Sequence, residues 1–89
     1  MYNNRSYYNS EGHQQAVAKA RGRPLENSRI GIRLENPNID YAGLARSFGI
    51  HAEGPIEDPE DLRPAFERSV KRVKENKLPV LLDVVTQPR

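Results

Sequence analysis

LPVLLDVVT, at residues 78–86, contains a run of apolar residues that is interrupted only by Asp83 between Val80 and Val85. The lack of polar alternation is typical of a strand covered on both faces of its sheet. Full burial of the five apolar side chains in this run would contribute roughly 10 kcal/mol, at about 2 kcal/mol each. That amount is comparable to the whole free energy of unfolding of a typical domain. The strand therefore needs more cover than one short neighbouring strand can give.

Two amphipathic helices and a short strand are predicted before this run. Asp40 can cap the first helix, because its side-chain oxygen can accept a free amide of the first turn. Residues 50–54 form the short strand. The second helix starts at Asp58-Pro59, an N-cap followed by proline at the first helical position, and continues to about Asn76. The apolar face expected for the first helix consists of Tyr41, Leu44, Ala45 and Phe48.

The order helix, strand, helix, strand predicts an α/β fold with a parallel sheet and right-handed crossovers. The strand at residues 78–86 needs more neighbouring strands and cover than 89 residues with 36% hydrophobic content can supply. We therefore expect part of a three-layer sandwich. We therefore expect the chain to be about half of a domain.

The first third of the chain is more polar. Tyr2-Asn3-Asn4 is expected to follow the last residue or two of a strand, which places Asn3-Asn4 at the carboxyl end of a parallel strand. Residues 6–20 are compatible with a helix and residues 21–29 with a loop. Ile30, Ile32 and Leu34 alternate with Gly31 and Arg33, which predicts an extended segment.

Composition excludes several classes of protein. The chain has no cysteine, which rules out disulfides and thiolate metal sites. No apolar run approaches the roughly 18 residues of a membrane span, and the N-terminus has no signal-peptide core, so we expect a cytoplasmic protein without membrane contact. The net charge of +2 arises within residues 1–40 and is too small to indicate nucleic acid.

Three stretches, in this order, resemble the carboxyl-terminal part of thiamine-diphosphate-dependent enzymes, the group that contains acetolactate synthase and benzoylformate decarboxylase. YNNRSY at residues 2–7 is similar to the Asn-Asn end of the family's cofactor motif. NPNIDYAGLARSFG at residues 36–49 is similar to the helix and glycine that follow the cofactor site. PVLLDVV at residues 79–85 is similar to the closing strand.

The resemblance implies roles for the residues around Asn3-Asn4. Asn4 would bind Mg²⁺ through its side-chain oxygen, and Ser6 through its backbone carbonyl, while Asn3 would support the site. Tyr7 and Tyr8 would lie near the cofactor diphosphate. Neutral oxygens of this kind suit Mg²⁺, which takes few protein carboxylates when phosphates fill other positions. The implied cofactors are thus thiamine diphosphate and Mg²⁺.

The departures from the family pattern are equally informative. The Gly-Asp-Gly start of the motif is absent, and so is the glutamate of the family's other cofactor-binding domain. The chain alone is therefore expected to hold no catalytic residue and to be inactive. Where decarboxylases of the family carry an acidic residue after Asn-Asn, Ser10 stands here with Glu11 beside it. Whether Glu11 takes that role is open from the sequence.

The resemblance implies a partial thiamine-diphosphate-binding domain over residues 1–89, with a cofactor-loop and lid-like region at 1–36 and the helix-strand-helix-strand region at 37–89. The function implied is decarboxylation or carboligation of 2-oxo acids, with the remainder of the enzyme or a homo-oligomer partner completing the site. The alternative is a non-enzymatic module that docks onto a partner through its open sheet edge.

Several polar residues have simpler interpretations. His13 could exchange protons with a substrate, but a solvated helix position explains it better, and His51 is interpreted as structural. The acids at 57–61 suit a helix start. Asp83 is interpreted as structural and needs a partner if buried. No aromatic residue lies between the basic residues of the first third, so a solvated loop is favoured there over a nucleic-acid site; these residues are Lys19, Arg21, Arg23, Arg29 and Arg33.

Overall fold

The computed structural model describes residues 1–87, which divide into two units. The first, here called the sheet unit, comprises residues 1–3 and 40–86, and the second, here called the α1 unit, comprises residues 4–39 with Gln87. Each unit is described by itself.

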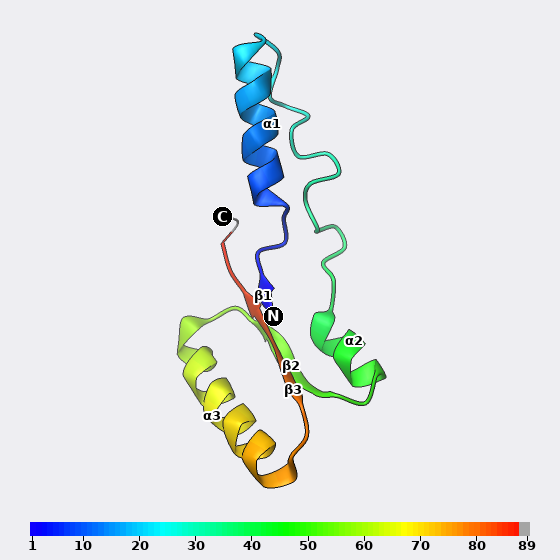
Figure 1. Cartoon of the computed structure of the whole chain (residues 1–89), viewed down its shortest axis with the longest axis vertical. Coiled ribbons are helices and arrows are strands. Elements are labelled where there is room, and N and C mark those ends of the chain that lie inside the picture. The colour runs from blue at the N-terminus through cyan, green and yellow to red at the C-terminus, as the bar shows by residue number, and fades with distance from the viewer. Residues whose placement is uncertain (88–89) are drawn as a thin grey trace. The chain divides into compact units, whose positions relative to one another are not determined.

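The sheet unit holds three parallel strands in the order β1-β3-β2 (Figure 1). They are β1 at Tyr2–Asn3, β2 at His51–Ile56 and β3 at Val80–Val85. Tyr2 pairs with Val84 in register, and His51 pairs with Val80. The parallel sheet and the closing strand are thus confirmed. The strand expected to end just before Tyr2 instead includes Tyr2 and Asn3.

Two helices complete the sheet unit, α2 at Tyr41–Ser47 and α3 at Pro59–Asn76. Asp40 caps α2 by accepting a hydrogen bond from the Gly43 amide at 2.9 Å, and Asp58 caps α3 by accepting one from the Glu60 amide at 2.9 Å. The predicted order of helix, strand, helix and strand is therefore confirmed. The helix α3 also continues through Pro64.

The two helices cover opposite faces of the sheet, because successive residues of a strand point to opposite faces. On one face Leu82 packs with Ile56 and Ala65 of α3. On the other, Leu81 packs against a cluster that includes Ala42 and Ala45 of α2. The result is the expected layering of helix, sheet and helix.

The predicted apolar face of α2 is wrong in part. Ala42 and Ala45 are buried, whereas Leu44 and Phe48 are exposed. Small alanine side chains let the helix approach the strands closely, and the larger apolar side chains point elsewhere.

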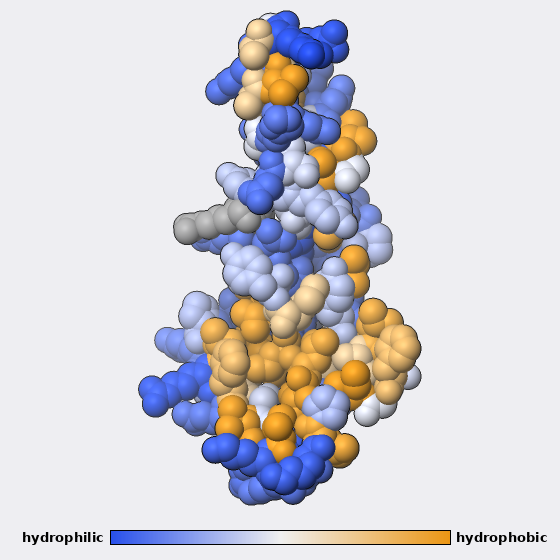
Figure 2. Space-filling view, in the orientation of Figure 1, coloured by the Kyte–Doolittle hydropathy of each residue, from blue (hydrophilic) through white to orange (hydrophobic). Residues whose placement is uncertain are grey.

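The β1 side of β3 carries an apolar surface. Only two residues of β1 pair with β3, so the amino-terminal part of β3 has no partner strand on this side in the described structure. Apolar side chains gather here in the lower half of Figure 2. A groove of about 440 Å³ lies among them, and its apolar lining consists of Met1, Phe66, Val70, Val73, Val80, Leu82 and Val84. We call this the β3 groove.

The α1 unit contains one regular element, α1 at Tyr8–Ala20. Residues 30–34 do not form the predicted extended segment; they are mostly turns, and only Arg33 makes an isolated antiparallel bridge, to Ser6. Gly31 has φ +74°, in the left-handed region. A glycine there bends the chain, and the apparent alternation of residues 30–34 therefore does not produce a strand.

Candidate cofactor-binding site

A tight turn at Asn4-Arg5-Ser6 is the centre of the candidate site. The Asn4 side-chain oxygen Oδ1 accepts a hydrogen bond from the Ser6 amide at 3.2 Å. Arg5, between them, has φ +53°, a left-handed conformation that costs a residue with a side chain roughly 1–3 kcal/mol. Such strain persists only where the surrounding structure enforces it.

Two backbone hydrogen bonds tie this turn to the segment that returns from α1. The Tyr7 amide donates to the Ile32 carbonyl at 2.9 Å, and the Leu34 amide donates to the Arg5 carbonyl at 2.8 Å. These bonds flank Ser6 and Arg33 and form the antiparallel bridge between them. The turn is therefore fixed on both sides of Ser6.

Ser6 presents two oxygens without partners among the described residues. It is buried, at 6% exposed, and its Oγ has no hydrogen-bond partner. Its carbonyl oxygen also accepts no hydrogen bond from residues 1–87. Buried polar atoms are normally satisfied, so these oxygens are suited to a ligand that supplies the missing interaction.

The oxygens of Asn4 and Ser6 fit a hard cation, because Mg²⁺ prefers oxygen ligands. They are neutral and supply no charge. No group of three or more His, Cys, Asp and Glu that could hold a metal occurs within residues 1–87. A divalent ion at this turn would therefore need negative charge from the diphosphate or from residues beyond those described.

The tyrosines lie directly after the turn, at the start of α1. Tyr7 is the N-cap residue and makes no side-chain capping hydrogen bond, and both Tyr7 and Tyr8 are exposed. A helix start without a side-chain cap favours anions, because its amides and dipole present positive charge. Asn4, Ser6, Tyr7 and Tyr8 thus occupy one continuous stretch of the α1 unit.

Asn3 belongs to the sheet unit, where its side chain already has a partner. Its Nδ2 donates to Asp83 Oδ1 at 3.0 Å, and both residues are buried. Asp83 therefore has one hydrogen-bond partner at Oδ1, whereas its Oδ2 has none among the described residues. The arrangement links Asn3 to the end of β3.

Glu11 is the residue whose environment the sequence did not reveal. Its side chain is 5% exposed, and its two carboxylate oxygens face Arg33: Nη2 donates to Oε1 at 3.2 Å, and Nε lies 3.1 Å from Oε2. Arg29 lies 3.5 Å from Oε1 but is 71% exposed. The one sequence signal was a lone acid on α1 with two arginines four residues apart further along.

The remaining candidates lie on exposed surfaces. His13 is exposed and borders a hollow of about 410 Å³ in the α1 unit with Val17, Arg21 and Pro24. This placement is compatible with a solvated helix position. Lys19, Arg21 and Arg23 are likewise exposed, whereas Arg29 and Arg33 pair with Glu11, a role that the prediction of a solvated loop did not include.

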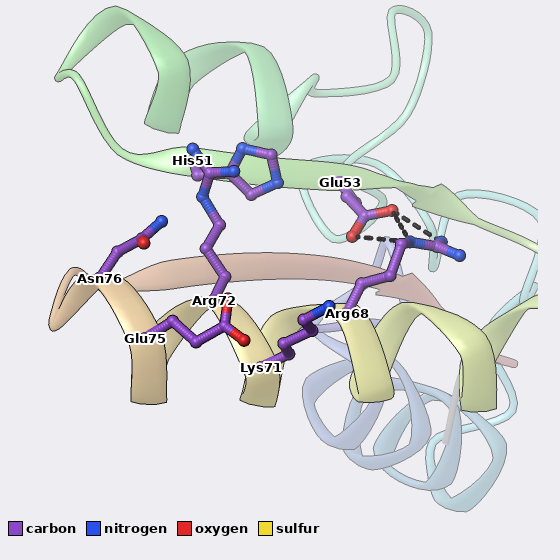
Figure 3. Close-up of a pocket in the computed structure, with 7 residues that line it drawn as sticks. All are labelled: His51, Glu53, Arg68, Lys71, Arg72, Glu75 and Asn76. Carbon is purple, nitrogen blue, oxygen red and sulfur yellow. Dashed lines mark hydrogen bonds and ion pairs between the residues drawn. The ribbon is translucent and has the colours of Figure 1, made fainter.

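A polar hollow lies between β2 and α3 of the sheet unit (Figure 3). Arg68 of α3 holds Glu53 with a forked ion pair, whose shortest distance is 2.8 Å between Nη2 and Oε1. This hydrogen bond raises the pKa of Arg68 above its ordinary value. Arg72 extends toward His51, while Lys71 lies along the helix. Because Glu53 is already paired with Arg68 and His51 is exposed, we interpret this hollow as a solvated surface where α3 packs beside β2.

The chain was also compared with known proteins. The family model described as thiamine pyrophosphate enzyme, C-terminal TPP binding domain, matches residues 1–84. The chain belongs to this family. No solved structure matched it.

Family membership agrees with the geometry of both units. The small α/β fold with its parallel sheet is that of a thiamine pyrophosphate C-terminal domain, and the family supports thiamine diphosphate as the cofactor. The match includes the Asn4–Ser6 turn as well as most of β3. Among the described residues, no helix combines the length and the apolar character that crossing a membrane requires.

Proposed function

We propose that the chain is the metal- and diphosphate-binding C-terminal part of a thiamine-diphosphate- and Mg²⁺-dependent enzyme that acts on 2-oxo acids. The enzyme class is that of acetolactate synthase and benzoylformate decarboxylase, which decarboxylate or ligate such substrates. The observation that carries the proposal is the strained turn at Asn4–Ser6, whose Ser6 oxygens have no partner among residues 1–87, within a chain of this family.

Each residue of the turn has a defined task in this proposal. Asn4 Oδ1 and the Ser6 carbonyl bind Mg²⁺, and the hydrogen bond from the Ser6 amide keeps Asn4 in position. Tyr7 and Tyr8 contact the diphosphate at the start of α1, and Asn3 supports the preceding strand end. Thiamine diphosphate, when bound, supplies the carbon that adds to the substrate carbonyl. Residues 1–36 form the cofactor-loop and lid-like region.

The rest of the enzyme, or a second subunit, completes the site and covers the β3 groove. The exposed apolar side chains of α3, beside partly buried ones of β3, support this proposal, because large apolar patches on monomeric soluble proteins often mark interaction sites. The same groove also favours the second candidate function, a non-enzymatic module that docks through its open sheet edge. The two candidates differ in whether the Asn4–Ser6 turn binds a metal.

Paramagnetic Mn²⁺ in place of Mg²⁺ tests the proposal in the full 89-residue chain. With thiamine diphosphate present, Mn²⁺ should broaden the amide resonances of Ser6 and Tyr7 selectively, because relaxation falls steeply with distance from the ion. Asn4→Ala should abolish the broadening, whereas Asn38→Ala, an exposed asparagine of the same unit, should leave it unchanged. A docking module would show no broadening at the turn in any variant.

Calorimetric titration with thiamine diphosphate and Mg²⁺ adds the affinity. We expect binding weaker than micromolar, because the oxygens of Asn4 and Ser6 carry no charge to offset the ion. Micromolar binding by the folded chain alone would show that the site needs no residues beyond those present.

A further inference from the structure

We propose that Glu11 is a positioning residue for the Asn4–Ser6 turn, and that it acts through Arg33. Glu11, Arg33 and the Asn4–Ser6 turn all lie within the α1 unit. Only the identity of the ligand that benefits from this positioning, a divalent metal with thiamine diphosphate, rests on the proposed function.

The turn at Asn4–Ser6 contains a strained residue and needs contacts outside it to keep its conformation. Arg5 sits at φ +53°, where a side chain is strained, and the 3.2 Å hydrogen bond from the Ser6 amide to Asn4 is long for its kind. The bridge to Ile32 and Leu34, with hydrogen bonds of 2.9 and 2.8 Å, opposes this strain. Loss of the bridge would let Arg5 relax and would move the Ser6 carbonyl.

The bridge in turn has little regular structure to hold it. Residues 30–34 are mostly turns and belong to no strand, so their backbone needs an anchor. Arg33 is the residue directly opposite Ser6. Its guanidinium meets the carboxylate of Glu11 at two points: Nη2 donates a hydrogen bond to Oε1 at 3.2 Å, and Nε lies 3.1 Å from Oε2 as an ion pair without a hydrogen bond.

Burial makes this anchor effective. The side chain of Glu11 is 5% exposed and that of Arg33 is 23% exposed, so the pair is screened less than a surface pair. An arginine left without its buried carboxylate would be costly to keep in place. The contact from Arg29 is longer and solvent-exposed and cannot replace it. Glu11 of α1 thus holds Arg33, and Arg33 lies in the bridge opposite Ser6, just before α1 begins.

These contacts give Glu11 a role different from proton transfer. Both of its oxygens lie against the guanidinium of Arg33, Oε1 with a hydrogen bond and Oε2 with an ion-pair contact alone, so the carboxylate is engaged by an arginine. The acid beside Ser10 therefore shapes the site without touching a substrate.

The first test is amide hydrogen exchange on the full chain without ligand. Glu11→Gln should speed exchange at Tyr7 and Leu34, the two bridge donors, at least tenfold. The matched control is Glu67→Gln, which removes the acid of an exposed Arg63–Glu67 pair and should leave both amides unchanged. Arg33→Lys keeps the charge but loses the second nitrogen that faces Glu11, and its effect should be intermediate. Unchanged exchange at Tyr7 and Leu34 in Glu11→Gln would overturn the proposal.

The second test separates positioning from a purely structural role. In Mn²⁺ titrations with saturating thiamine diphosphate, Glu11→Gln should raise the half-saturating Mn²⁺ concentration about tenfold. At saturating Mn²⁺ its affinity for thiamine diphosphate should stay within twofold. If exchange quickens but the Mn²⁺ dependence does not change, Glu11 is only structural and the proposal is wrong. If the unsubstituted chain shows no Mn²⁺ at the turn, the proposed function fails, while the exchange data still decide whether Glu11 holds the turn.

Discussion

Asp83 shows how one buried carboxylate shapes the end of the sheet. It is 1% exposed, and its Oδ1 accepts the hydrogen bond from Asn3, while Oδ2 has no partner within the described residues. Burying a carboxylate with an incomplete set of partners costs free energy, and the surroundings confine Asp83 almost completely, since it is only 1% exposed. Gly54 on the neighbouring strand adds to this confinement by its close approach to Asp83.

Asp83→Ala should lower the free energy of unfolding by about 1–3 kcal/mol, because it removes the buried hydrogen bond from Asn3 Nδ2 to Asp83 Oδ1. Asp83→Asn keeps an acceptor oxygen and should cost less. Urea denaturation followed by circular dichroism measures both. Glu75→Ala, on the exposed side of α3, is the control and should change little. An equal loss in all three variants would contradict the assigned contact.

Gly54→Ala should be strongly destabilising, by about 2 kcal/mol or more. Gly54 has φ +145°, and an added Cβ would meet the Asp83 Cβ at 2.7 Å and its carbonyl oxygen at 2.8 Å. Gly12→Ala is the opposite case, since nothing lies within 4 Å of a Cβ at Gly12 and alanine favours a helix. It should gain about 0.5–1 kcal/mol. Thermal melts of the two variants should therefore shift in opposite directions.

At the scale of elements, α3 combines a firm attachment with an exposed apolar flank. Ala65 and Ser69 are buried against the sheet, while Phe66, Val70 and Val73 stay exposed along the β3 groove. The helix therefore has two apolar faces, and only one of them is used within the described residues. The second face is the physical basis for expecting a covering partner.

Phe66→Ser should reduce the binding of a hydrophobic fluorescent dye to the chain while changing the free energy of unfolding by less than about 1 kcal/mol. The reason is that Phe66 is already 52% exposed. Val17→Ser, at an exposed position of α1, is the control and should affect dye binding less. A large loss of stability in Phe66→Ser would mean that the groove is filled in solution.

The sequence allowed most elements of the sheet unit to be predicted, because their signals are local. The caps at Asp40 and Asp58 and the apolar run of β3 depend only on neighbouring residues. The packed face of α2 was not predictable from periodicity, since alanines rather than Leu44 and Phe48 contact the strands. The prediction for residues 30–34 was wrong because the sequence alternates as in a strand, while the backbone bends at Gly31, where φ is +74°.

At the scale of the whole molecule, the candidate site was predictable only through family resemblance. Asn4 and Ser6 are common turn residues, and nothing in their spacing indicates a metal. The Glu11–Arg33 pair was hidden because its members are 22 residues apart and only the folded chain brings them together. The division into units was also hidden, since residues 1–3 join strands formed from the far end of the chain.

Removal of residues 1–3 should destabilise the sheet unit as a whole. It takes away β1, the Asn3–Asp83 hydrogen bond and the backbone bonds that Val84 and Thr86 donate to this segment. We expect a lower melting temperature and more aggregation, because the entire edge of β3 becomes available for pairing with other chains. Light scattering during a thermal melt measures both. An unchanged melting temperature would show that β1 contributes nothing to the stability of the sheet unit.

The parallel direction of β1 has a practical consequence for handling the protein. The amino group of Met1 lies 2.9 Å from the Leu82 carbonyl, so any residues fused ahead of it in an extended conformation would run along β3 toward Val80. An affinity tag placed there would lie along the same edge of β3 as the proposed partner and would imitate or block its docking. Pull-down experiments with this chain should therefore carry their label elsewhere.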